Sequence, residues 1–120
     1  MPRLSLAALT LTAAALTAAT LPQPARADLV IDGRAAQALH CAAMLFMVSD
    51  TLYDAGLLDS TTTNTAQENA VRMLAFVPGT DDQKVQAMGQ RFAKLQRSRT
   101  LDQLFDEYNS TATWCTKTFL

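Results

Sequence analysis

The chain has 120 residues, of which 49% are hydrophobic and 18% are charged, and its formal net charge at pH 7 is −1. A chain of this length has room for one domain with a modest core. The near-neutral balance gives no electrostatic basis for binding nucleic acid, because proteins of that class gather Lys and Arg on one face. The basic residues Arg91, Lys94, Arg97 and Arg99 are spaced instead as the solvated flank of a helix.

Residues 1–27 have the three-part layout of a secretory signal peptide. Arg3 gives a short positive start, a run rich in Leu, Ala and Thr follows, and residues 22–27 combine two prolines with the ending Ala-Arg-Ala. Such an ending predicts cleavage after Ala27. The predicted mature domain is residues 28–120, an exported protein of the periplasm or the medium with no stable membrane span. The alternative is that the leading segment stays attached as a membrane anchor.

The longest helical pattern of the remaining chain covers residues 34–55. Asp32 is a favourable N-cap before it, and Gly56 a favourable residue after it. Apolar residues recur at helical spacing along it: Ala38, Cys41, Leu45, Val48 and Leu52. With further apolar neighbours the stripe exceeds half of the circumference, which predicts a central helix buried on several sides. Asp50 and Asp54 make it a poor membrane span.

A polar loop is predicted over residues 57–64, followed by a helix over residues 66–77. The motif that predicts this helix start is a capping box from Thr65 to Glu68, in which two side chains satisfy the first free amides. A Pro-Gly pair directly after Val77 ends the helix.

Two further capping boxes begin at Thr80 and Thr100, each with a Gln three residues later. They predict helices over residues 81–97 and 101–117, or one bent helix that runs through both. The sequence therefore predicts an all-α fold, a small four-helix bundle with short connections.

Cys41 and Cys115 are the only cysteines. In an exported chain they are expected to pair, and the disulfide would staple the first helix to the last. A loop of this length corresponds to a stabilisation of about 4 kcal/mol in the chain-entropy model. Because the two cysteines are far apart in sequence, the bridge is predicted to be structural rather than a redox pair. Two free thiols, or a bridge between two chains, are the alternatives.

The most suggestive candidate for a ligand site is the set His40, Met44 and Met47 on one flank of the first helix. An imidazole and two thioethers suit a soft metal such as Cu(I). Methionine is also a common filler of helical cores, and His40 fits a hydrogen-bonded, partly buried residue equally well. No haem attachment motif is present, and no cofactor is predicted.

Paired carboxylates offer the other route to chemistry. Asp50 and Asp54 lie one turn apart, and Asp102, Asp106 and Glu107 form a second acidic flank. A cleft that raised one carboxyl pKa would allow acid–base work. Acidic helix faces are usually solvated, so no catalytic residue is assigned and the protein is predicted not to be an enzyme.

Aromatic residues supply the candidates for an interface: Phe76 at the edge of one apolar stripe, and Tyr108 and Trp114 near the C-terminus. The competing interpretation is that they complete the core. Wide apolar stripes around so small a core favour a protein that binds another protein, a peptide or a second copy of itself. The alternative function is a carrier of a small ligand or soft metal built on His40, Met44 and Met47.

In size, compartment and cysteine count the chain resembles the periplasmic acid-stress chaperones of the HdeA type. Cys41 and Cys115 carry that resemblance, and the lysine-rich tail of such proteins is missing. It implies a third function, acid-dependent chaperoning, with partial opening as carboxylates take up protons at about pH 2 to 3.

Overall fold

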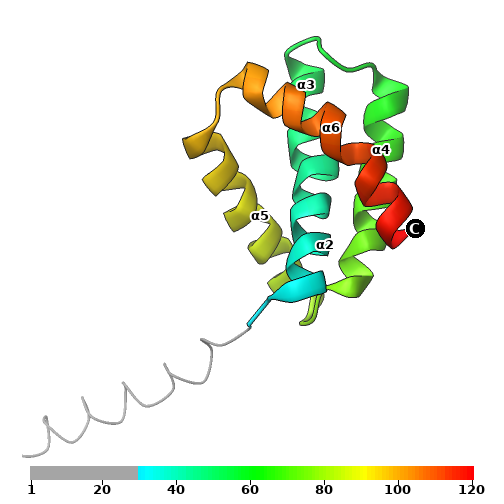
Figure 1. Ribbon diagram of the computed structural model, residues 1–120, viewed down its shortest axis with the longest axis vertical. Coiled ribbons are helices and arrows are strands. Elements are labelled where there is room, and N and C mark those ends of the chain that lie inside the picture. The colour runs from blue at the N-terminus through cyan, green and yellow to red at the C-terminus, as the bar shows by residue number, and fades with distance from the viewer. Residues whose placement is uncertain (1–29) are drawn as a thin grey trace, which may run out of the picture. The chain divides into compact units, whose positions relative to one another are not determined.

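One long helix runs through the middle of the fold, as the apolar stripe predicted (Figure 1). It comprises α2 (Gly33–Ala43), a π-helical turn η2 (Met44–Val48) and α3 (Ser49–Asp54), which we together call the central helix. The helix ends before Gly56, whose positive φ of 78° suits a residue without a side chain. The computed structural model describes residues 30–120, and Ile31–Leu120 form one compact unit. The predicted leader, residues 1–27, lies outside the described residues.

The start of the central helix differs from the prediction. Asp32 occupies the N-cap position with extended backbone, but its carboxylate accepts no hydrogen bond from the first turn. Gly33 follows with a φ of 56°, so the chain enters the helix through a left-handed residue. The expected side-chain cap is therefore not formed, although Asp32 occupies the predicted position.

The π-helical turn in the middle of the central helix was not predicted. Side chains donate hydrogen bonds to carbonyl groups along this wider turn. Ser49 Oγ donates to the carbonyl oxygens of Leu45 at 2.6 Å and Phe46 at 3.0 Å. Gln67 of the neighbouring helix also donates to the Phe46 carbonyl, at 3.3 Å. These bonds satisfy backbone oxygens that regular α-helical pairing would otherwise use.

Helix α4 (Ser60–Met73) begins earlier than the capping box at Thr65 predicted, so the predicted loop is right for residues 57–59 and wrong for residues 60–64, which are helical. Asp59 is the N-cap, and its Oδ1 accepts from the Thr62 amide at 2.7 Å. This hydrogen bond lowers the pKa of the Asp59 carboxyl. A short 3₁₀ turn, η3 (Leu74–Phe76), completes the element before Pro78.

Helices α5 (Asp81–Ser98) and α6 (Leu101–Phe119) are two separate helices rather than one bent one. Both predicted capping boxes are confirmed. The amides of Thr80 and Thr100 each donate to the Gln side chain three residues later at 2.8 Å. The threonine hydroxyls accept from the same Gln residues' amides at 3.2 Å.

The central helix is the common packing partner of the bundle. In Figure 1, α4 and α5 flank it on opposite sides and α6 crosses it diagonally. Helix α6 packs on all three segments of the central helix and has little backbone contact with α4 or α5. Core residues of the central helix are almost completely buried: Ala38, Cys41, Met44, Leu45, Val48 and Leu52. The described residues contain no strand, so the all-α, four-helix prediction is confirmed.

By length and composition, Gly33–Asp54 is the one helix among residues 30–120 that qualifies as a membrane span. The share of its most apolar window that is buried inside the bundle is 56%. The core helix of a bundle passes the same test.

Candidate functional site

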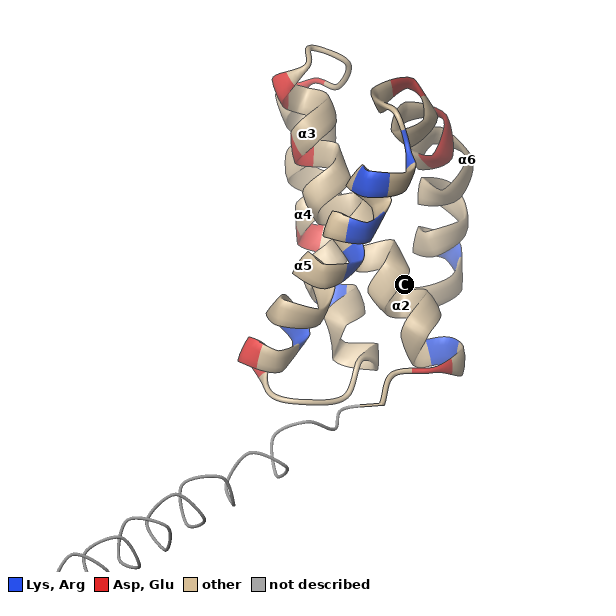
Figure 2. Cartoon of the chain, turned by 90° about the vertical axis from the view of Figure 1, so that its left-hand side faces the viewer, with Lys and Arg blue, Asp and Glu red and all other residues tan. Residues whose placement is uncertain are grey.

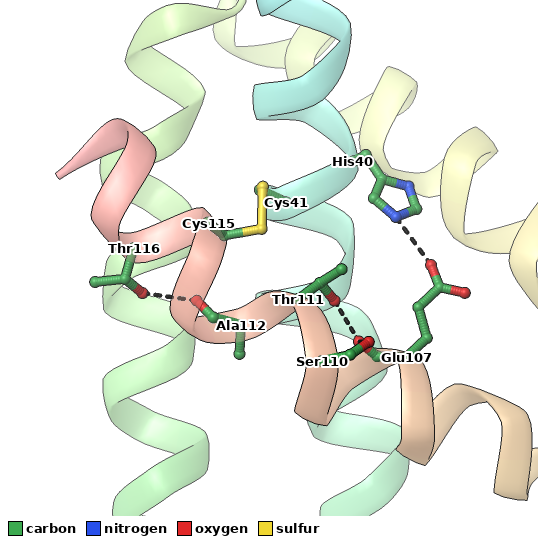
Figure 3. Close-up of a disulfide and its surroundings, with 8 residues drawn as sticks. All are labelled: His40, Cys41, Glu107, Ser110, Thr111, Ala112, Cys115 and Thr116. Carbon is green, nitrogen blue, oxygen red and sulfur yellow. Dashed lines mark hydrogen bonds and ion pairs between the residues drawn. A yellow bond between two sulfur atoms is a disulfide. The ribbon is translucent and has the colours of Figure 1, made fainter.

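Helix α6 is joined to the central helix by the disulfide. Cys41 and Cys115 lie at disulfide distance, with their Cα atoms 5.6 Å apart, and both residues are completely buried. Figure 3 shows the bridge running directly between α2 and the C-terminal half of α6. The two cysteines are thus placed as the predicted link between the first helix and the last requires.

A second link between the same helices is polar. His40 Nε2 lies 3.0 Å from Oε2 of Glu107, and the two side chains point toward one another in Figure 3. Arg99 Nε donates to the other oxygen of the same carboxylate. Burial lowers the pKa of His40 below its usual 6.5, and it outweighs the raising effect of Glu107; the Arg91 and Arg99 cations lower the pKa further.

This arrangement bears on the soft-metal hypothesis. His40 is half-buried and hydrogen-bonded, Met44 is completely buried, and Met47 is half-buried. The Nε2 atom of His40 already has a carboxylate partner. Within residues 30–120 no group of three His, Cys, Asp or Glu side chains is placed to hold a metal ion.

Of the predicted acidic residues, four are exposed to solvent and one is paired with basic side chains. Asp50, Asp54, Asp102 and Asp106 are exposed, as expected for solvated helix faces. Glu107 differs, because it bridges His40 and Arg99. Figure 2 shows Lys and Arg along one flank of α5. Just beyond the end of α5, Arg99 forms an ion pair with Glu107 in the acidic first half of α6.

Aromatic side chains gather around Arg34 where the central helix begins and α6 ends. The Arg34 guanidinium carbon lies 4.7 Å from the ring centre of Phe119 and 5.7 Å from that of Phe76. Arg34 Nη2 also donates to the Thr118 carbonyl at 3.1 Å. Trp114 meets Phe119 edge-on, with ring centres 6.2 Å apart.

The three predicted interface candidates do not form one surface. Phe76 and Trp114 are 42% and 46% exposed, whereas Tyr108 is only 5% exposed and belongs to the core. Tyr108 also lines a groove between α4 and α6 with a volume of about 550 Å³. The groove's lining is mostly apolar surface, with threonine side chains on both helices.

The groove's floor is made by Leu45, Ala66 and Tyr108, all of them buried. Its rim is more polar and more exposed, and includes Thr61, Thr62, Thr65 and Asn69 of α4 and Thr113, Thr116 and Lys117 of α6. The groove exists because α6 crosses the central helix without packing closely on α4. It forms a shallow trough with an apolar floor and hydroxyl-bearing walls.

Burial also affects the ionisable group on the groove floor, the phenol of Tyr108. The pKa of the Tyr108 phenol is raised because the charged form would lose its hydration. The sequence did not reveal the groove, since Thr61 and Thr62 of one wall fell in the segment predicted to be a loop. The run of three threonines after Asp59, a strong N-cap, is the signal that would have revealed the wall.

Comparison with protein-family models, with curated proteins and with solved structures finds no match for this chain.

Proposed function

We propose that this protein is an exported, non-enzymatic binding protein that takes up a nonpolar segment of another polypeptide in the groove between α4 and α6. The groove itself is the observation that carries the proposal. Its buried floor offers apolar surface, and its rim offers hydroxyl and amide groups that can pair with a peptide backbone.

Export is supported by two features of the chain. The leading segment has the layout of a secretory signal, and the two cysteines lie at disulfide distance, as expected in an oxidising compartment. The absence of catalysis is proposed because carboxylates that do acid–base work need a cleft that raises a pKa. Asp50, Asp54, Asp102 and Asp106 are all exposed.

The test fills the groove with a bulky charge. Ala112 lies partly buried on the α6 wall, so Ala112→Arg would occupy the trough. Val85 on α5 is 57% exposed and does not line the groove, so Val85→Arg is the matched control. The protein purified after export is titrated with short nonpolar peptides and followed by NMR shifts. We expect shifts at the groove in the control and at least tenfold weaker binding in Ala112→Arg; equal binding by both variants would reject the groove as the site.

Acid-dependent chaperoning is a second candidate, and one observation favours it. The lowered pKa of His40 means that the fold loses stability when this residue takes up a proton. A chaperone of that kind would keep a model client soluble in acid and not at neutral pH. Client protection seen at neutral pH alone would contradict it.

A further inference from the structure

Tyr108 is a nearly buried polar side chain without a hydrogen-bond partner among residues 30–120. It is 5% exposed and lines the floor of the groove. None of the side-chain hydrogen bonds of the described residues involves its hydroxyl, and because no polar atom shut off from solvent lacks a partner among these residues, the hydroxyl reaches solvent at the groove. The hydroxyl is thus free to donate to an acceptor that enters the groove.

Lys117 is the only ionisable cation among the residues that line the groove, and no Asp or Glu is among them. It takes part in neither of the ion pairs found within residues 30–120, which join Glu107 to His40 and to Arg99. The groove therefore presents an unopposed positive charge at its rim, and charge complementarity favours an occupant with one anionic group.

The remaining wall groups distinguish between classes of anionic occupant. The side chains of Thr65, Asn69 and Thr113 make no hydrogen bond within the described residues. An alkyl chain laid along the trough would cover these groups and leave them unpaired, which is unfavourable. A peptide backbone brings a donor and an acceptor with nearly every residue and can pair with them.

We infer that the groove recognises the free C-terminal end of a nonpolar polypeptide, with the terminal carboxylate paired to Lys117 and a backbone carbonyl accepting from the Tyr108 hydroxyl. This inference rests on the proposed function and names the part of the partner that is bound. A volume of about 550 Å³ suits a short chain end rather than a whole helix, since pockets for small ligands measure roughly 300–1,000 Å³.

The test compares one tetrapeptide, acetyl-Gly-Ala-Val-Leu, in its free-acid and amidated forms, by calorimetry and NMR at pH 7. We expect the acid to bind at least tenfold more tightly than the amide. In Lys117→Gln the two forms should bind alike, whereas Lys94→Gln, an exposed lysine of α5 outside the groove, should keep the difference. Equal affinity of both forms for the unmodified protein would overturn the inference and leave the proposed function standing. Failure of both forms, with binding of a fatty acid instead, would overturn both.

Tyr108→Phe provides a second, independent readout. Because the hydroxyl has no partner within the described residues, its removal should leave the melting temperature unchanged while both peptide forms bind about three- to tenfold more weakly. A fall of several degrees in melting temperature without a change in peptide affinity would show that the hydroxyl serves the fold, and would overturn its role in the site.

Discussion

Arg34 and Phe119 stack across the two ends of the described chain, with the guanidinium carbon 4.7 Å from the ring centre. The same guanidinium donates to the Thr118 carbonyl in the last turn of α6, where backbone oxygens lack partners within the helix. One side chain at the start of the central helix thus caps the far end of α6 and covers its last aromatic ring.

Replacement of Arg34 by alanine should therefore destabilise the protein. We expect a loss of about 1 kcal/mol, since cation–π contacts at exposed sites contribute roughly 0.5–1 kcal/mol and the carbonyl loses a charged donor. Arg34→Lys should recover part of the loss. Urea unfolding monitored by circular dichroism measures the difference, with the exposed Arg97→Ala as control; equal stability of the two alanine variants would contradict the stacking argument.

The disulfide should carry a large share of the stability. Its cysteines are 74 residues apart, and the chain-entropy model gives about 4 kcal/mol for a loop of this length. The double replacement Cys41→Ala, Cys115→Ala should lower the urea midpoint accordingly. Because both cysteines are completely buried, a reductant should reach the bridge in the native protein only when α6 opens. Thiol release from folded protein as fast as from urea-unfolded protein would contradict this.

Stability should fall in mild acid because of His40. Its folded pKa is lowered, first by burial, so between 6.5 and that lower pKa the unfolded state binds more protons than the folded state. The loss begins as the pH falls through about 6.5, proceeds at no more than about 1.4 kcal/mol per pH unit, and stops below the folded pKa. Above about pH 6.5 this contribution is constant.

Two variants isolate the His40 contribution. The free energy of unfolding of His40→Gln, measured with urea at a series of pH values, should not change over this interval. Glu107→Gln removes the carboxylate that raises the pKa of His40, so its decline should extend to lower pH than that of the unmodified protein. Parallel curves for all three proteins would assign the acid sensitivity to other groups.

Processing of the leader is open to a direct measurement. The protein recovered after export should begin at Asp28, the residue after the Ala-Arg-Ala ending. Intact-mass spectrometry reads this directly, and an Ala27→Leu variant should block the cut and accumulate the longer form. A recovered mass that includes residues 1–27 would support the anchor alternative instead.

Local signals in the sequence predicted much of the fold. Thr80 and Thr100 each stand three residues before a Gln, and both capping boxes form as expected. The same rule failed at Thr65, because Asp59 starts the helix earlier and places Thr65 inside it. Thr63 shows how the tertiary structure supports this start: it is 4% exposed and donates to the Asp59 carbonyl at 2.8 Å.

Features of the site that depend on distant residues were not predictable in this way. Glu107 appeared as one of several solvated acids, and only the crossing of α6 over the central helix brings it to His40. At the π-helical turn, too, a distant residue takes part: Gln67 of a neighbouring helix donates to the Phe46 carbonyl. The groove arises from the angle of α6, which no local pattern encodes.

Cys115 lies in sequence between residues that form one wall of the groove, so formation of the disulfide determines when that wall is fixed. Thr113, Thr116 and Lys117 lie within two residues of it, so the wall they form is held in place by an oxidised sulfur pair. Under the proposed export, the newly made precursor in the reducing cytosol has no such bridge, so its groove wall is not covalently fixed and should bind peptide ends more weakly. Tight capture would begin only once translocation and oxidation are complete, and a reduced sample that held acetyl-Gly-Ala-Val-Leu as tightly as the oxidised one would refute that order of events.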